Sequence, residues 1–552
     1  MSMQEDQHIS ARDAFHQWLI DRRIQRMFGN PGSTELPMLI NWPKSVEYVL
    51  GLQESIVVAM ADAYAQATGQ CALVNLHAAQ GLGNAIGSLR TALYNHAPMV
   101  VTVGQEDTRH QIFEPLLYGD GDMVSLGKPV VKWSYEVKGA PDLVPALERA
   151  WQLAQLPPAG PVLLAIPMNI WDQSASLFAI RQSHTPEIAD PELVRPIVEA
   201  LSKANAPALV LGGGVARSDA FDEAVHLAER LQCPVYGAPL AERMGFPNQH
   251  PLYEGMLAPA LPLILQTLGK HDVVVVIGAP AFMTYPYLTG PRSLPMQVYH
   301  IDDIPVNLSA SLAQHTFNYP IKPAISALAS QVPATSQTRP DTTTARVAKR
   351  KSAASRSQQV MGVPYVLDTL SRMMPNDTVI IDEAISASSL VREYLNVHRR
   401  GQYFSTSTGG LGWGIPAGIG AALANPGQKV LVVIGDGASL YSVQALWTLS
   451  RLNLPVGVVV LNNQKYAILN EFGKMLYPGL ESTIPGLQLP GVDLVKLSEG
   501  FSISASDITT PEELEAGLNS VWNKGDGIGV GSFSSGPFLF DVAVTSDAIS
   551  LA

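Results

Sequence analysis

Short, continuously apolar segments recur along the chain, and several of them end in a glycine-containing turn that leads into a longer segment with helical spacing. They are rich in Val, Ile and Leu, a composition typical of strands that are buried on both faces of a parallel sheet. The predicted strands lie at residues 71–76, 98–104, 161–166, 207–214, 272–278, 378–382, 429–437 and 455–463. Strands that alternate with helices in this way predict an α/β fold built from doubly wound parallel sheets.

Two interruptions divide this pattern. Residues 334–360 are rich in Ser, Thr and Ala and hold six basic residues against one acid, and we interpret them as a solvated linker rather than a binding surface. A softer break lies near residues 172–192. We therefore predict three α/β domains, at residues 1–182, 190–333 and 361–552, with the linker before the third.

The composition points to a large buried surface. Of the 552 residues, 47% are hydrophobic and only 15% are charged, and that charged fraction is well below the usual quarter. Extensive subunit interfaces would account for part of this burial. The formal net charge of −12 argues against a nucleic-acid-binding protein, so we expect a small-molecule partner.

Features of membrane or secreted proteins are missing from the sequence. The apolar runs fall far short of the roughly 18 to 20 residues that span a bilayer. The first residues carry acids where a secretory signal has a basic region, and Cys71 and Cys233 lie too far apart in the sequence to suggest a zinc cluster or a disulfide framework. We expect a cytoplasmic protein.

The strongest chemical signal lies in the third predicted domain. One strand ends in Gly435-Asp436-Gly437, and the next ends in Asn462-Asn463. A carboxylate and an amide at the carboxyl ends of successive parallel strands are oxygen donors suited to Mg²⁺ or Ca²⁺, and glycines let the backbone approach a phosphate. Either motif alone is more simply a turn, but the two together, with 24 residues between Gly437 and Asn462, indicate a site for a metal-bridged diphosphate.

This pair of motifs resembles the signature of thiamine diphosphate (ThDP) enzymes. The resemblance implies that Asp436, Asn463 and the main-chain carbonyl of Lys465 bind Mg²⁺. The cofactor-binding residues that it implies beside them are Gly435, Gly437, Ala438, Ser439 and Tyr466.

The first domain offers an independent test of this resemblance. ThDP enzymes need a carboxylate beside the aminopyrimidine ring, and Glu54 follows a predicted strand and begins a helix that is apolar nearly all round. On its own, Glu54 would be a first-turn glutamate favoured by the helix dipole. With the diphosphate motifs present, we interpret it as the carboxylate that exchanges a proton with the cofactor ring.

The resemblance then narrows to one branch and covers nearly the whole chain. Segments similar to benzoylformate decarboxylase lie at residues 28–37, 75–89, 131–136, 246–255, 271–282, 409–420 and 435–449. That resemblance implies pyrimidine-binding, middle and diphosphate-binding domains, and decarboxylation of a 2-keto acid to an aldehyde and CO₂. It also implies a homo-oligomer, usually a homotetramer, with active sites at dimer interfaces, where Glu54 would serve a cofactor held by the partner's Asp436.

Further roles follow from the resemblance position by position. Ser33 would bind the substrate carboxylate, and His77 would transfer protons. Leu411 would be the wedge that holds the cofactor bent, with the Gly409 carbonyl receiving its amino group. Without the resemblance, Ser33 is more simply a turn residue, and His77 is as well explained as a structural histidine.

Three positions depart from the benzoylformate decarboxylase pattern. Tyr285 stands where that family has a second active-site histidine, and a tyrosine, with an unperturbed pKa of about 10 against about 6.5, is a poorer proton shuttle at neutral pH. Ile468 stands where the family has an alanine while Phe472 is retained, which predicts a pocket for a smaller or aliphatic acyl group. Ile385 replaces a threonine near the diphosphate, so Ser386 becomes the nearby hydroxyl.

Other hypotheses remain open. The glycines at 212–214 suggest a dinucleotide site, but the next strand segment, LQCPVYGAPL, has no acid for the ribose, so we favour a structural remnant. A carboligase or lyase that forms or cleaves 2-hydroxy ketones is the alternative activity, and Tyr285 favours it by slowing protonation. A cofactor-binding protein without turnover is disfavoured, because it would not need Glu54.

Overall fold

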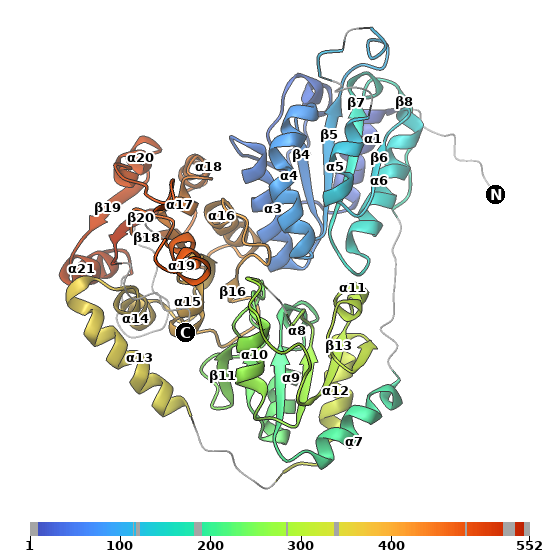
Figure 1. Cartoon of the computed structure of the whole chain (residues 1–552). Helices are drawn as coiled ribbons and strands as arrows, with labels where there is room; N and C mark the ends of the chain where they lie inside the picture. The colour runs from blue at the N-terminus through green and yellow to red at the C-terminus, as the bar shows by residue number, and fades with distance from the viewer. Residues whose placement is uncertain are drawn as a thin grey trace. The chain divides into compact units, whose positions relative to one another are not determined.

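The computed structural model describes residues 9–113, 115–117, 122–180, 190–282, 285–335, 342–480, 483–522 and 536–545. Three six-stranded sheets lie along the chain, all of their strand pairs parallel, and helices flank them (Figure 1). The predicted α/β class is therefore confirmed. All eight predicted strands are present, within a few residues of their predicted bounds.

The first sheet has the strand order β3-β2-β4-β5-β7-β6. Its strands are β2 (Arg26–Gly29), β3 (Glu47–Leu50), β4 (Ala72–Leu76), β5 (Met99–Gln105), β6 (Ser134–Glu136) and β7 (Pro161–Pro167). The helices beside it are α1 (Ala11–Asp21), α2 (Leu36–Leu39), α3 (Glu54–Thr68), α4 (Ala78–Tyr94), α5 (Met123–Gly127) and α6 (Ala140–Gln155). The short strands β1 (Ile9–Ser10) and β8 (Ser174–Ala175) pair antiparallel beside them.

The second sheet has the order β11-β10-β9-β12-β13-β14. Its strands are β9 (Pro207–Leu211), β10 (Val235–Gly237), β11 (Tyr253–Met256), β12 (Val273–Ile277), β13 (Gln297–Asp302) and β14 (His315–Asn318). Its helices are α7 (Arg195–Lys203), α8 (Gly213–Arg217), α9 (Phe221–Leu231), α10 (Leu261–Leu268), α11 (Pro305–Ser309) and α12 (Ile321–Gln331).

The third sheet has the order β16-β15-β17-β18-β20-β19. Its strands are β15 (Val379–Glu383), β16 (Tyr403–Phe404), β17 (Val430–Gly435), β18 (Val456–Asn462), β19 (Ser504–Ile508) and β20 (Phe538–Ala543). The helices of this part of the chain are α13 (Thr343–Ser357), α14 (Val363–Met373), α15 (Ser388–Tyr394), α16 (Gly414–Ala424), α17 (Asp436–Ser439), α18 (Ala445–Leu452), α19 (Ala467–Leu476), α20 (Leu494–Gly500) and α21 (Pro511–Val521).

The segment predicted as a solvated linker contains the helix α13. Alanine, lysine and arginine are strong helix formers, which explains why this polar segment is helical without a long apolar stripe. Arg346 donates to the Asn248 carbonyl, and Arg350 donates to the Glu393 carbonyl at 2.6 Å. Two of the basic side chains therefore attach the helix to neighbouring segments of the chain rather than extend into solvent.

The chain forms two compact units, and they do not follow sequence order. The first contains the N-terminal sheet together with residues 410–427 and 441–454, which carry α16 and α18. The second contains the other two sheets. Within the described residues, none of the helices has both the length and the apolar character that a membrane span needs.

Candidate active site

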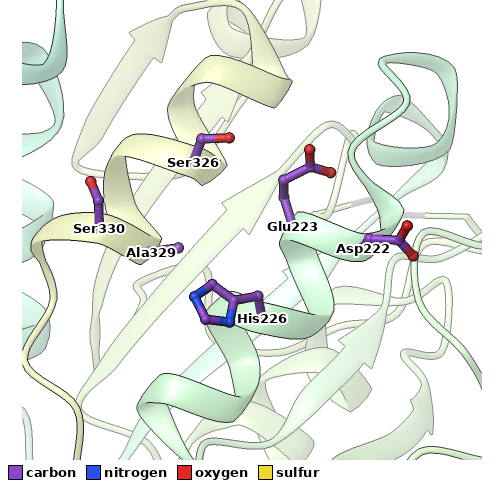
Figure 2. A pocket seen from close by; sticks show the side chains of 6 residues that line it. All are labelled: Asp222, Glu223, His226, Ser326, Ala329 and Ser330. Atoms are coloured by element: carbon purple, nitrogen blue, oxygen red, sulfur yellow. The ribbon is translucent and has the colours of Figure 1, made fainter.

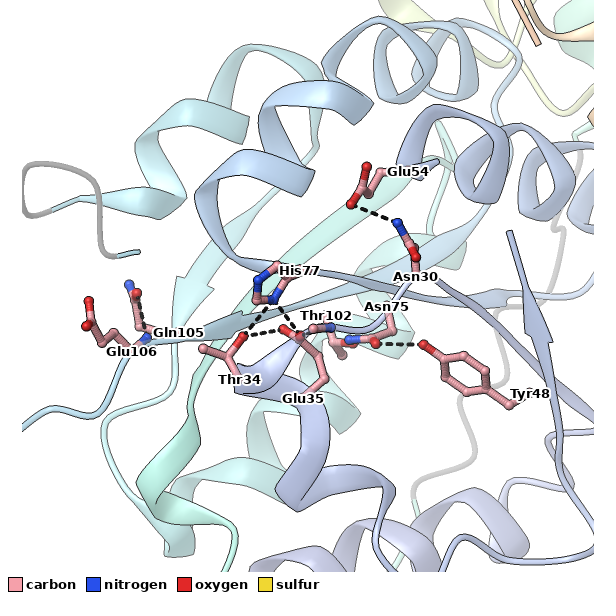
Figure 3. A network of polar contacts seen from close by, with 11 residues as sticks. Asn30, Thr34, Glu35, Tyr48, Glu54, Asn75, His77, Thr102, Gln105 and Glu106 are labelled. Atoms are coloured by element: carbon pink, nitrogen blue, oxygen red, sulfur yellow. Dashed lines mark hydrogen bonds and ion pairs between the residues drawn. The ribbon is translucent and has the colours of Figure 1, made fainter. Parts of the chain in front are cut away.

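The predicted residues of the first domain meet at one edge of the first sheet. Strands β2 and β4 are neighbours, and Ser33 lies a few residues beyond the carboxyl end of β2. His77 directly follows β4 (Figure 3). The chain order of the strands reverses between β2 and β4, and such a switch point is where open α/β sheets bind ligands. The fold therefore places these side chains where a small molecule can be bound.

Glu54 begins α3, as the sequence predicts. Glu54 is only 7% exposed, and the side-chain amides of Asn30 and Asn84 donate to its two carboxylate oxygens at 3.1 and 3.0 Å. Glu54 packs so closely against Gly81 that a Cβ on this glycine would lie 2.8 Å from Glu54 Oε1. The result is a buried carboxylate whose orientation is held by neutral donors.

His77 is held by Glu35, a residue that the sequence analysis missed. Its Nδ1 lies 2.8 Å from Glu35 Oε2 and 3.2 Å from the Thr34 hydroxyl. Glu35 is buried and accepts two further hydrogen bonds, from Gly32 N–H and the Thr34 hydroxyl. Because an ionised carboxylate only accepts, Nδ1 carries a proton and Nε2 is the nitrogen that can face a ligand.

Ser33 lies in the same cluster. It begins the 3₁₀ helix η1 (Ser33–Glu35), is exposed, and follows Gly32, where a Cβ would overlap the His77 ring. Ser33 is thus the chain neighbour of the glycine that packs against the His77 ring. Asn30 and Glu35 could have been suspected from the sequence only by their position, since Asn30 directly follows β2 and Glu35 lies two residues after Ser33.

The predicted metal ligands also meet. Asp436 follows β17 and Asn463 follows the neighbouring strand β18. Asp436 is 8% exposed, and the backbone N–H groups near its carboxylate, among them those of Gly437 and Gln464, partly offset the effect of burial on its pKa. Burial raises the pKa of Asp436, which means that its negative charge lacks compensation that a bound cation would supply.

The oxygen donors of this group fit Mg²⁺. Asn463 Oδ1 accepts from Lys465 N–H at 3.1 Å, and the Lys465 carbonyl accepts from Ala467 N–H at 3.0 Å, which leaves each oxygen a second lone pair. Hard cations prefer such carboxylate, amide and carbonyl oxygens. In the part of the chain that the structure describes, no three His, Cys, Asp or Glu side chains form a metal cluster, so an ion here depends on these oxygens.

The other predicted cofactor residues lie close to this group in the chain. Gly437 packs against the Tyr466 ring, with 2.5 Å between that ring and a Cβ built on the glycine, and the Ser439 hydroxyl donates to the Asp436 carbonyl at 2.7 Å. Gly435 faces open space and Ala438 is buried. Ser386 follows β15, the strand beside β17, and is half-buried, as is the Ile385 side chain before it.

Three predicted pocket residues lie together in the second unit. The ring of Tyr285 meets that of Phe472 edge-on, with centroids 5.8 Å apart. Ile468 lies one turn before Phe472 on α19, so the two share a helix face. Tyr285 is 65% exposed, which leaves its hydroxyl accessible.

The chain was compared with known proteins. Residues 9–120, 194–328 and 385–529 match, in order, the families described as the N-terminal TPP binding domain, the central domain and the C-terminal TPP binding domain of thiamine pyrophosphate enzymes. Benzoylformate decarboxylase of Pseudomonas aeruginosa is 35% identical over 517 residues, which cover 90% of this chain and 93% of that protein. The chain belongs to the thiamine diphosphate-dependent 2-keto acid decarboxylase family.

A solved structure and a more distant relative agree with this. The thiamine diphosphate-dependent 4-hydroxybenzoylformate decarboxylase of Rhodococcus jostii superposes with a TM-score of 0.87 at 32% identity, covering 98% of this chain and all of that one. The acetolactate synthase large subunit of Haemophilus influenzae is 26% identical over 542 residues, with 93% and 92% of the two chains covered.

In this ThDP enzyme, the loop that carries Leu411 is tied to α3. Trp413 donates its indole N–H to Asp62 at 2.7 Å, and Asn95 donates to the same carboxylate oxygen at 2.8 Å. Leu411 itself is half-buried. Gly409, two residues before Leu411, is exposed and has a φ of +66°, a conformation that favours glycine.

The glycine-rich turn of the second domain is filled by the protein's own groups. A Cβ on Gly213 would overlap the Glu242 carboxylate, which Arg217 binds at 2.7 Å. Gly214 packs against Gly278 at the end of the neighbouring strand, where a Cβ would lie 2.7 Å from the Gly278 Cα. These contacts occupy the place where a dinucleotide phosphate would approach the turn.

A pocket of about 410 Å³ lies elsewhere in the second unit of this ThDP enzyme, between α9 and α12 (Figure 2). Its lining residues are Asp222, Glu223, His226, Ser326, Ala329 and Ser330. None of these is a predicted site residue, so this pocket is separate from the candidate active site.

Proposed function

We propose that the protein catalyses the non-oxidative decarboxylation of a 2-keto acid to an aldehyde and CO₂, with ThDP and Mg²⁺ as cofactors. The observation that supports this most is Glu54, a buried carboxylate bonded on both oxygens, at the same sheet edge as the His77–Glu35 pair. When bound, ThDP supplies a nucleophilic carbon and accepts the electrons released as CO₂ leaves.

The remaining roles, in proton transfer, substrate binding and cofactor binding, fall to residues of the chain. Glu54 exchanges a proton with the cofactor ring, and its burial favours that exchange by excluding water. Ser33 binds the substrate carboxylate, while His77, held through Nδ1, presents Nε2 for proton transfer. Leu411 would pack against ThDP, and the Gly409 carbonyl would accept a hydrogen bond from its amino group.

We assign the binding of Mg²⁺ and of the ThDP diphosphate to residues of the second unit. Asp436, Asn463 and the Lys465 carbonyl would hold Mg²⁺, because their oxygens form a hard donor set beside glycines that leave the backbone accessible. Gly435, Gly437, Ala438, Ser439, Tyr466 and Ser386 would surround the diphosphate.

The acyl pocket is assigned to Tyr285, Ile468 and Phe472. The aromatic edge contact and the branched Ile468 one turn away form an apolar wall that suits benzoylformate or a smaller acyl group. The Tyr285 hydroxyl would hydrogen-bond the reacting group instead of a second histidine.

We propose that the enzyme is a cytoplasmic homotetramer with active sites at dimer interfaces. Glu54 and Asp436 belong to different compact units, so a second copy can supply the missing half of each site. Both cysteines are buried and free, which fits a reducing compartment.

CO₂ release tests the proposal. The protein, with ThDP and Mg²⁺, would be given benzoylformate, phenylpyruvate, pyruvate and branched aliphatic 2-keto acids. We expect release from at least one acid, and a loss of at least about 100-fold in Glu54→Gln, since the amide cannot exchange the proton. Glu47→Gln, which changes an exposed glutamate on β3, is the matched control and should keep full activity.

A carboligase is the second candidate, and the exposed tyrosine at position 285 is what favours it. If the carbon from which CO₂ has left is protonated slowly, it has time to react with the carbonyl group of a second molecule. An acceptor aldehyde added to the same assay would then yield a 2-hydroxy ketone. No CO₂ from any acid, with the ketone also absent, would refute both activities.

A further inference from the structure

The third sheet contains a buried acid that the proposed mechanism does not use. Asp541 lies on β20, between β18 and β19, in register with Val460 on one side and Asp507 on the other. It is 7% exposed. Among the described residues, no Lys, Arg or His forms an ion pair with it.

Two hydrogen bonds lead from Asp541 through Asn462 to the loop that carries Asn463 and Lys465. Asn462 donates its Nδ2 to Asp541 Oδ1 at 2.9 Å, and its Oδ1 accepts from Gln464 N–H at 3.1 Å. Because Oδ1 must accept and Nδ2 must donate, the amide can adopt only this orientation. Asn462 is therefore fixed between the sheet and the backbone of the loop that follows it.

That loop carries the ligands themselves. Gln464, whose N–H donates to Asn462 Oδ1, lies in the chain between the proposed ligands Asn463 and Lys465. Asn463 Oδ1 accepts from Lys465 N–H. A change in the Asn462 side chain would thus move the loop that holds the Asn463 amide oxygen and the Lys465 carbonyl oxygen.

We propose that Asp541 is a positioning residue that acts through Asn462 to set the affinity of the Asp436–Asn463–Lys465 oxygens for a divalent cation. The proposal rests on the proposed function, which assigns Mg²⁺ to these oxygens. Groups that orient metal ligands typically change metal affinity about 10- to 100-fold when they are removed.

The test measures metal binding rather than turnover. Apoenzyme is prepared with EDTA, and Mg²⁺ is titrated at saturating ThDP while cofactor binding is followed by tryptophan fluorescence. We expect Asp541→Ala to raise the Mg²⁺ dissociation constant about 10- to 100-fold. Asp541→Asn keeps an acceptor oxygen for Asn462 and should stay within about 5-fold of wild type. At saturating Mg²⁺ and ThDP, kcat should change less than about 2-fold in both variants.

Two controls make the result specific. Asp507→Asn removes an exposed charge from the adjacent position on β19 and should leave the dissociation constant unchanged. Asn462→Ala should weaken Mg²⁺ binding as much as Asp541→Ala, and the double variant should be no weaker than either, because both act through one contact. This series also gives a result if Asp541→Ala does not fold.

Three outcomes would overturn the proposal. An unchanged dissociation constant in Asp541→Ala would show that Asp541 does not act on the metal site. Equal weakening in Asp541→Asn and Asp541→Ala would assign the effect to charge and not to positioning. Wild-type protein that binds ThDP equally well in EDTA would refute the metal assignment itself, and this is seen before any variant is made.

Discussion

Glu35 lies two residues after Ser33, and its carboxylate accepts from Gly32 N–H, from the Thr34 hydroxyl and from His77. A single side chain therefore sets the turn that presents Ser33 and also the tautomer of His77. A glutamate in a first turn is unremarkable in sequence, because the backbone N–H groups there favour acids in any protein.

We expect Glu35→Gln to lower kcat/KM about 10- to 100-fold, because the glutamine amide can donate to Nδ1 and so stabilise the wrong tautomer. The pH profile of kcat should shift as well, which a merely structural role would not cause. Steady-state kinetics from pH 5.5 to 8.5 measures both quantities, with Glu47→Gln as the control. An unchanged profile in Glu35→Gln would contradict the role given to Glu35.

Asp303 gives a pH dependence of stability. Its pKa is raised to about 6, because burial outweighs the opposing effect of Arg217 and the neighbouring Asp302 carboxylate adds to the rise. The folded protein then binds more protons than the unfolded chain between about pH 4 and pH 6, so the free energy of unfolding falls as the pH rises through that window.

Asp303→Asn removes this proton uptake. We expect the variant to be more stable than wild type at pH 7.5, by an order of 1–2 kcal/mol, because the deprotonated acid is no longer buried. At pH 5, in the middle of this window, the difference should be about half as large. Thermal unfolding at both pH values measures the difference, and a gap that is larger at pH 5 would show that the sign is wrong.

At the scale of elements, α3 and α16 pack backbone to backbone. A Cβ on Gly420 would overlap the Met60 carbonyl, so the two helices approach closely at that point. Both are buried on nearly every face. The glycine is thus required by a neighbour that lies far away in sequence.

Gly420→Ala should destabilise the protein by about 1–3 kcal/mol, because the helices must separate to admit one methyl group. The matched substitution Gly87→Ala lies on α4 with open space around it, and it should be neutral or slightly stabilising. Melting temperatures of the two variants measure the contrast. Equal melting temperatures would mean that the helices separate at no cost.

The same elements show how far sequence alone can lead. The start of α3 at Glu54 and the strands before Asp436 and Asn463 were predictable, because apolar runs and turn glycines act locally. The grouping of Glu35 with His77 and of Trp413 with Asp62 joins positions 42 and 351 residues apart, and no local pattern records such pairs. The helix α13, within the segment interpreted as a solvated linker, was not predicted, because only a few of its long side chains make contacts with the rest of the chain.

For the whole molecule, the central prediction is that each active site needs two copies of the chain. Glu54→Gln and Asp436→Asn chains should each be inactive alone. In mixed dimers, purified through a different tag on each chain, one of the two sites contains both intact residues, so about half of the wild-type activity should return. Mixed dimers without activity would place each complete site within one chain.

The discontinuous first unit also determines when the protein can fold. Asp62 and Trp413 are separated by 351 residues, so the surface of α3 that α16 covers stays bare while the ribosome makes the intervening chain. At about 5–20 residues per second, that interval lasts roughly 20 to 70 s. The part of the protein that is synthesised first is therefore completed late, and during synthesis it is the part with the greatest need of a chaperone.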